Sequence, residues 1–219
     1  MVRRIMPSRF ITFEGLDGSG KSTHLRRAAR WLELSGVAFE QTRNPGGTHL
    51  GQAIRGLVLD PATGPLDGVV EALLMFADRR HHLEHVVEPA LAAGRHVLCD
   101  RFTDSTLAYQ GAGRGVPPAT LDAIDQAATG RRRPDHTLLF DLPAVEARRR
   151  GQSESRRVTE GVDRIDAEDL AFYERVRQAF LAMARHEAER FTVIDAAGSV
   201  DDTWSQVERA LVAQLLERS

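Results

Sequence analysis

The sequence predicts an α/β fold of three layers, in which helices cover both faces of a five-stranded parallel sheet. Short apolar runs recur along the 219-residue chain, and longer segments with helical periodicity separate them. Strands that are apolar throughout are buried on both faces, and helical crossovers join such strands in parallel. The length, with no linker-like stretch, suits a single domain over residues 1–219.

The expected elements alternate along the chain. The strands are predicted at Phe10–Phe13, Val37–Thr42, His96–Asp100, Thr137–Leu142 and Phe191–Asp195. Helices are expected from Leu25 to Gly36, from His49 to Leu59, from Asp67 to near Gly94 with a bend at Pro89, from Ser105 to Gln110, from Pro117 to Ala128, from Pro143, from Ala167 and from Asp201 to Leu216. The glycines from Gly111 to Gly115 predict a flexible segment. We expect the functional site where the strands end, at the edge of the sheet that binds ligands in α/β proteins.

Composition narrows the function classes. The formal net charge is −2, which gives no overall attraction to nucleic acid or to a membrane. The triplet Arg131–Arg133 is interpreted as a solvated turn. A single cysteine, Cys99, excludes an intramolecular disulfide and suits a reducing compartment. The amino terminus lacks the apolar region of a signal peptide, so we expect a cytoplasmic protein without a membrane span.

The segment GLDGSGKS, residues 15–22, predicts a phosphate-binding loop and with it a P-loop NTPase fold. It follows an apolar strand and precedes a helix, which is the context that G-x-x-x-x-G-K-[ST] requires. Its glycines let backbone N–H groups turn toward a polyphosphate, which the helix N-terminus also attracts. Lys21 would add a charge at the β- and γ-phosphates, and Ser22 a ligand for Mg²⁺. The expected ATP contacts are Gly15, Leu16, Asp17, Gly18, Ser19, Gly20, Lys21, Ser22 and Thr23.

A second polar pair ends the strand His96–Asp100. Asp100 lies where a carboxylate would reach Mg²⁺, and Arg101 would add a guanidinium for a second phosphate group. A phosphate loop alone does not separate a kinase from a GTPase or a motor ATPase. No N-K-x-D or T-K-x-D motif follows, which argues against a GTPase. Lys21, Asp100 and Arg101 are therefore predicted catalytic residues, with Ser22 and Asp100 as the metal ligands.

An arginine-rich segment over about 148–164 predicts a catalytic lid. Such a charge run is usually a solvated surface. A phosphoryl-transfer enzyme, however, needs an element that excludes water and brings positive charge to the transferring group. Gly151 and the serines among the arginines predict a mobile backbone here.

These segments resemble those of bacterial thymidylate kinases. The resemblance rests on GLDGSGKST at 15–23, TRNPGGT at 42–48, LLMFADR at 73–79, CDRFTDSTLAYQGAGRG at 99–115, RPD at 133–135 and DRID at 163–166. The motifs cover nearly the whole chain in order. The resemblance implies Mg²⁺-dependent transfer of the ATP γ-phosphoryl group to dTMP, which gives dTDP and ADP in dTTP synthesis, by a homodimer.

The resemblance also implies roles at the phosphate and sugar. Asp17 would meet the acceptor 3′-hydroxyl, while Arg43 and Arg101 would hold the acceptor phosphate. Tyr109 would crowd the 2′ position and so disfavour ribonucleotides. Arg150 best matches the lid arginine at the transferred phosphoryl group.

Other roles concern the two bases. Phe76 would stack on thymine, Arg79 would reach its O4 edge, and Thr106 with Gln110 would lie near its other edge. Residues 195–197 would lie beside the donor adenine.

The chain departs from the family pattern at two places. Asn44 stands where the family usually has Glu before the proline of this loop, for which a cis bond is expected. The lid is longer than usual, so Arg149, Arg156 and Arg157 are rivals of Arg150. The alternative functions are a kinase of another monophosphate, such as UMP or a purine nucleotide, and a P-loop switch ATPase. Paired Arg43 and Arg101 favour a kinase, because a switch has no acceptor phosphate to hold.

Overall fold

The computed structural model describes residues 7–151 and 164–216. Five parallel strands form one sheet in the order β2-β3-β1-β4-β5. Their bounds are Phe10–Gly15 for β1, Phe39–Arg43 for β2, His96–Asp100 for β3, His136–Asp141 for β4 and Phe191–Asp195 for β5. The five-stranded parallel sheet predicted from the apolar runs is therefore confirmed.

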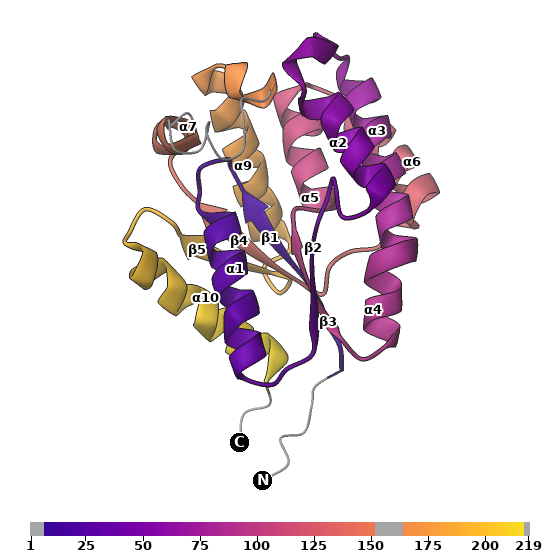
Figure 1. The fold of residues 1–219 in the computed structure, drawn as a ribbon. Coiled ribbons are helices and arrows are strands. Elements are labelled where there is room, and N and C mark those ends of the chain that lie inside the picture. Colours follow the sequence, from indigo (N-terminus) through magenta and orange to yellow (C-terminus); the bar gives the residue numbers. More distant parts are fainter. Residues whose placement is uncertain (1–6, 152–163, 217–219) are drawn as a thin grey trace.

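Helices cover both faces of the sheet (Figure 1). On one face lie α1 (Lys21–Leu34) and α10 (Val200–Leu215), which contact each other. The opposite face is covered by α4 (Glu88–Ala92), α5 (Thr103–Thr106) and α9 (Leu170–His186). The remaining helices are α2 (His49–Leu59), α3 (Gly68–His82), α6 (Pro118–Thr129) and α7 (Ala144–Gly151). Among the described residues, no helix has the length and apolar character needed to cross a bilayer.

The core is built around the central strand β1. All its residues are buried, and its neighbours in the core include Leu25 and Leu32 of α1 and Phe180 of α9. Two threonine hydroxyls within this core hydrogen-bond to each other. The Oγ1 atoms of Thr12 on β1 and Thr137 on β4 lie 2.9 Å apart. This packing fixes the phosphate loop that follows β1.

The helix predicted from Asp67 to near Gly94 runs without a break from Gly68 to Ala92 and contains a π-helical turn. Asp67 caps α3 by accepting a hydrogen bond from the Val69 N–H. A π-helical turn, Leu83–Val87, then separates α3 from α4, in whose first turn Pro89 lies. Proline is tolerated there because the first turn of a helix leaves its N–H groups without intrahelical partners.

The flexible segment predicted at Gly111 to Gly115 is wrong for its first half. A π-helical turn, Leu107–Gly113, continues directly from α5. Gly113 is buried beneath α9, where a Cβ would lie 2.5 Å from Cε2 of Phe172. Glycine at this position permits close packing between two helices rather than mobility.

The predicted lid is described only at its two ends. Arg148, Arg149 and Arg150 belong to α7, which runs to Gly151, so helix stands where a mobile backbone was expected. A 3₁₀ turn, Arg164–Ala167, leads into α9. Residues 152–163, including Arg156 and Arg157, lie outside the described residues.

Candidate active site

A cavity of about 450 Å³ lies at the carboxyl ends of the strands. It is lined by these predicted site residues: Asp17, Gly18, Gly20, Lys21, Ser22, Thr23, Arg43, Arg79, Asp100, Arg101, Thr106, Tyr109, Gln110 and Arg150. Gly15, Leu16, Ser19 and Phe76 are not among the lining residues. The expectation that the site lies where the strands end thus agrees with the cavity.

The phosphate loop is held tightly against α7. Gly18 has φ = +81°, and a Cβ there would lie 2.3 Å from the Ala147 carbonyl oxygen, so only glycine fits. Lys21 is buried, and its Nζ donates to the Leu16 carbonyl at 2.7 Å. Burial and the nearby positive charge of Arg101 lower the pKa of Lys21 to about 8. The negative charge of a bound polyphosphate would counteract both causes and raise the pKa of Lys21 again.

Ser22 and Asp100 form a polar pair beside the loop. The Ser22 hydroxyl donates to Oδ2 of Asp100 at 3.1 Å, while Oδ1 of Asp100 is buried without a hydrogen-bond partner. Among the described residues, no three His, Cys, Asp or Glu side chains form a metal-binding group. Mg²⁺ at kinase sites needs only one or two protein oxygens besides substrate phosphates and water. The hydroxyl and the unpartnered carboxylate oxygen therefore fit Mg²⁺.

Arg101 is locked in place by contacts on several sides. Its backbone has φ = 68°, an uncommon value for a residue with a side chain. Its Nη2 lies 2.8 Å from Oδ1 of Asp17, and Nη1 donates to the Gly15 carbonyl at 3.0 Å and to the Ser105 hydroxyl at 2.9 Å. The guanidinium is thereby aimed at the phosphate loop.

Behind Arg101 lies a buried carboxylate, Glu14. It accepts hydrogen bonds from the Phe102 N–H at 2.7 Å and from the Ser105 hydroxyl at 2.6 Å. Burial and the neighbouring charge of Asp104 raise the pKa of Glu14 to about 7. Glu14 thus holds the Phe102 N–H, which directly follows Arg101, and the Ser105 hydroxyl, to which Arg101 also donates.

Arg43, Arg55 and Arg101 all line the cavity. Arg43 ends β2 and pairs in register with Asp100, while Arg55 projects from α2. Among the described residues, Arg43 has no hydrogen-bond or ion-pair partner, and Arg55 has only a 3.5 Å bond to the Pro45 carbonyl. Burial and the positive charges of Arg43 and Arg101 lower the pKa of Arg55. A cluster of mutually repelling cations is suited to a dianionic group.

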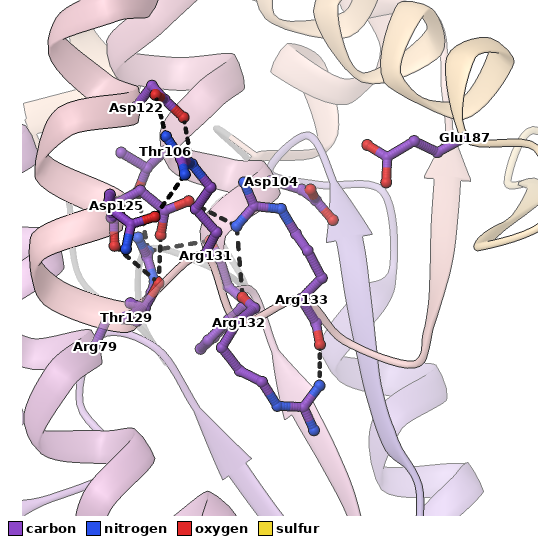
Figure 2. Close-up of polar contacts among 12 residues, drawn as sticks. Arg79, Asp104, Thr106, Asp122, Asp125, Thr129, Arg131, Arg132, Arg133 and Glu187 are labelled. Atoms are coloured by element: carbon purple, nitrogen blue, oxygen red, sulfur yellow. Dashed lines mark hydrogen bonds and ion pairs between the residues drawn. The ribbon is translucent and has the colours of Figure 1, made fainter.

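Arg79 occupies the far end of the cavity and is almost wholly buried. Its Nε donates to Oδ1 of Asn44 at 3.0 Å, and Nη2 donates to the Phe102 carbonyl at 3.1 Å. Nη2 also donates to the Thr106 hydroxyl at 2.9 Å (Figure 2). Its Nη1 is buried without a partner. Asn44, which precedes the cis bond to Pro45, donates its amide to Asp78. The guanidinium at this end of the site therefore keeps one donor, Nη1, that is buried and, among the described residues, has no partner.

Phe76 lies beneath this guanidinium rather than on the cavity wall. Its side chain is 1% exposed, and Cζ of Arg79 sits 4.5 Å from the ring centroid. The cation–π contact helps to hold the buried guanidinium.

Tyr109 and Gln110, from the π-helical turn Leu107–Gly113, form a cavity wall that packs against α3. The Tyr109 hydroxyl donates to Oδ2 of Asp17 at 3.1 Å, so the tyrosine and Arg101 hold the two oxygens of one carboxylate. The Gln110 amide nitrogen donates to Oε2 of Glu71 at 2.9 Å. Donors and acceptors at this end of the cavity are thus fixed by neighbouring side chains.

Comparison with known proteins identifies the family to which this site belongs. The family model described as thymidylate kinase matches residues 13–207. The thymidylate kinase of Desulfovibrio desulfuricans is 46% identical, over 95% of this chain and 97% of that protein. That of Chromobacterium violaceum is 46% identical over the whole of both chains. The crystal structure of thymidylate kinase from Ehrlichia chaffeensis matches with a TM-score of 0.73 and 33% identity, over 95% of this chain and 100% of that one.

The chain belongs to the thymidylate kinase family. The resemblance inferred from the sequence motifs is thereby confirmed. The α/β fold expected for a P-loop NTPase also agrees with the family structure.

The described lid arginines of this thymidylate kinase family member differ in position. Arg150 lines the cavity and donates to Glu146 at 2.8 Å and to the Ala196 carbonyl at 3.2 Å. Arg149 is largely exposed and, within residues 7–151 and 164–216, pairs only with Glu146. Between these two, the position in the cavity favours Arg150.

Two arginines of the basic triplet that precedes β4 pair with carboxylates of α6, and the third, Arg132, pairs with Glu88 of α4. Arg131 donates to Asp122 from Nε at 2.8 Å and from Nη2 at 2.6 Å, and Arg133 donates to Asp125 at 2.6 Å (Figure 2). Its charge is therefore largely compensated within the chain.

Sequence reasoning missed three residues of this thymidylate kinase site: Arg55, Glu71 and Asp78. Each is a charged side chain on the otherwise buried face of an amphipathic helix. That position was the available signal, because a charge on a buried helix face requires a partner or a ligand.

Proposed function

We propose that this chain transfers the γ-phosphoryl group of ATP to dTMP, which gives dTDP and ADP in dTTP synthesis. Membership of the thymidylate kinase family makes it an ATP-dependent kinase of this class. The observation that carries the proposal is the arginine cluster of Arg43, Arg55 and Arg101. It lines the same cavity as the phosphate loop and would hold a second phosphate.

The phosphate loop would hold the donor. Its N–H groups and Lys21 would bind the β- and γ-phosphates of ATP. Ser22 and Asp100 would hold Mg²⁺, which when bound supplies positive charge at the β- and γ-phosphate oxygens. Arg150, tied to Ala196 after β5, would connect the transferred phosphoryl group to the segment beside the adenine.

The acceptor would lie with its phosphate on Arg43, Arg55 and Arg101. Asp17 would meet the 3′-hydroxyl of the deoxyribose. Tyr109, which Asp17 holds through its hydroxyl, would crowd the 2′ position. Paired guanidinium groups suit a dianionic phosphate, since each supplies donors in a fixed fork.

The thymine would lie toward Arg79. The unpartnered Nη1 of Arg79 would donate to O4, and Thr106 and Gln110 would face the remaining polar edge. Phe76 would stack on the ring, which requires it to become accessible beside Arg79 when dTMP binds. Each of these contacts rests on the resemblance together with the position of the side chain.

The chemical step needs no strong general base. An oxygen of the dTMP phosphate is already anionic when it attacks the γ-phosphorus. As that bond forms, the bond from phosphorus to the β,γ-bridging oxygen breaks, and its electron pair leaves with ADP. Lys21, Arg101 and Arg150 would neutralise the charge that spreads over the transferred group.

We also propose that the chain forms a homodimer through α2 and α3. The two helices pack side by side (Figure 1) and leave large apolar side chains exposed: Leu50, Leu57, Val70 and Leu73. Apolar surface of this kind marks protein interfaces. Because Cys99 is a free, buried thiol, we place the reaction in the reducing cytoplasm.

Replacement of Arg101 tests the proposed binding of the acceptor phosphate. Arg101→Ala should lower kcat by at least about 100-fold, while the Kd of ATP changes little, because one charge-assisted interaction at the transferring group is lost. Arg101→Lys should also fail, since lysine lacks the fork. Arg95→Ala is the control, because Arg95 pairs with Glu40 in the surface away from the cavity. Near-normal turnover of Arg101→Ala would contradict the assignment.

A further inference from the structure

Glu71 is a fully buried carboxylate on α3, just behind the acceptor wall of the cavity. Burying a charge is costly unless opposite charges and hydrogen bonds compensate it. Here Arg164 donates to Oε1 at 2.6 Å, while Gln110 and Arg114 donate to Oε2 at 2.9 Å and 3.4 Å. Two of the three partners are structural cations, whereas Gln110 lines the cavity.

We propose that Glu71 is a positioning residue that fixes the amide of Gln110 and thereby selects the acceptor base. This inference rests on the proposed function, since it concerns how the same site distinguishes thymine from a cytosine base. The base selected would carry a hydrogen on N3 and a carbonyl at position 4.

The chemistry of Glu71 and Gln110 fixes which end of the amide faces the cavity. An ionised carboxylate only accepts hydrogen bonds, so the end of the Gln110 amide that faces Glu71 must be its NH₂ group. The amide oxygen is then the end left for the cavity. An acceptor at this position suits the N3–H of thymine.

Arg79 completes the selection from the other side. A guanidinium only donates, and Arg79, which lines the cavity, suits the O4 acceptor of thymine. A cytosine base presents an amino group at position 4 and an unprotonated N3. Cytosine would therefore place donor against donor at Arg79 and acceptor against acceptor at Gln110, and such mismatches reject a ligand strongly.

A second carboxylate on α3, two turns after Glu71, orients another side-chain amide in the same way. Asp78 lies seven residues after Glu71 and on the same buried face. It accepts a hydrogen bond from the amide nitrogen of Asn44, whose oxygen is thereby turned toward Nε of Arg79. One helix thus fixes the orientation of two amides, one at each polar edge of the base site.

The test replaces the carboxylate by an amide. In Glu71→Gln the new side chain can face Gln110 with either its oxygen or its nitrogen, so Gln110 is free to turn. The matched acceptors are dTMP and 5-methyl-dCMP, which differ only at N3 and position 4 of the base. We expect the ratio of their kcat/KM values to fall at least tenfold, mainly through a higher KM for dTMP, with the KM of ATP unchanged.

Two comparisons separate positioning from a structural role. In a Gln110→Leu background, Glu71→Gln should leave the acceptor ratio unaltered, because no amide remains to be oriented. Glu168→Gln is the matched control, since Glu168 pairs with Arg114 but contacts neither Gln110 nor the cavity. An unchanged ratio in Glu71→Gln, or an equal loss in both backgrounds, would overturn the inference.

If Glu71→Gln alone does not fold, the exchanged pair Glu71→Gln with Gln110→Glu provides the second test. The amide introduced on α3 could then donate to the carboxylate introduced on the cavity wall, whose other oxygen could only accept, so preference for dTMP should return. Preference for 5-methyl-dCMP in this variant would overturn the inference. Failure of the unaltered chain to phosphorylate dTMP would instead refute the proposed function.

Discussion

Lys21 is the residue whose charge controls binding of the donor. Its pKa of about 8 means that the ammonium group is lost as the pH rises through 8 in the ligand-free protein. ATP prefers the charged form, so its affinity should be constant below pH 8 and fall above it, approaching tenfold per pH unit. Calorimetric titration between pH 7 and pH 9.5 measures this. Lys21→Met should bind ATP weakly at every pH, and an equal fall in that variant would assign the titration to another group.

Single residues differed in how far the sequence could predict them. Lys21, Asp100 and Arg101 lie in local motifs, so their types and spacing were sufficient. Glu71 and Arg55 contact segments that are distant in sequence, and only packing of the helices brings Arg55 to the cavity and Glu71 behind its wall. Phe76 shows the opposite problem, because the motif indicates its type but not its burial beneath Arg79.

At the scale of elements, close packing of side chains around Gly47 constrains the loop between β2 and α2. A Cβ on Gly47 would lie 2.5 Å from Oγ1 of Thr42 and 2.6 Å from Nε2 of His82, two atoms that hydrogen-bond to each other. Gly47→Ala should therefore lower the free energy of unfolding by about 1–3 kcal/mol. It should also raise the KM of dTMP, because this loop follows Arg43.

The matched control is Gly56 in α2, where a Cβ would meet no atom within 4 Å. Gly56→Ala should raise the free energy of unfolding by roughly 0.5–1 kcal/mol, since alanine favours a helix more than glycine does. Denaturant titration of both variants gives the comparison. The steric account fails if Gly47→Ala is as stable as the unaltered chain.

Helices and strands were predictable where the residue pattern is typical of only one kind of element. The strands β3 and β5 have the predicted bounds, and the other three differ at their ends by one or two residues, because the strands of a parallel sheet are short apolar runs bounded by turns. Gly111 to Gly113 misled the prediction, since glycine permits either flexibility or close packing. Contact with Phe172 of α9 decides for packing, and that contact is not visible in the sequence.

At the scale of the whole molecule, the exposed apolar side chains of α2 and α3 predict the assembly. Leu57→Asp and Leu73→Asp should convert the dimer to a monomer, because each places a charge in the proposed interface. Sedimentation velocity measures the mass. Val212→Asp on α10 is the control, since it adds the same charge to a helix elsewhere and should leave the dimer intact. A monomeric unaltered chain, or dimers of both leucine variants, would contradict this interface.

The most direct measurement of the central claim is ADP release with ATP, Mg²⁺ and each of dTMP, dUMP, UMP, CMP, AMP and GMP in turn. The arginine cluster and the polar end at Arg79 predict that release depends on an acceptor and is fastest with dTMP, with dTDP as the product. A different preferred monophosphate would contradict the thymine site. Release of ADP at the same rate without any acceptor would contradict the kinase itself and leave only the nucleotide-binding loop.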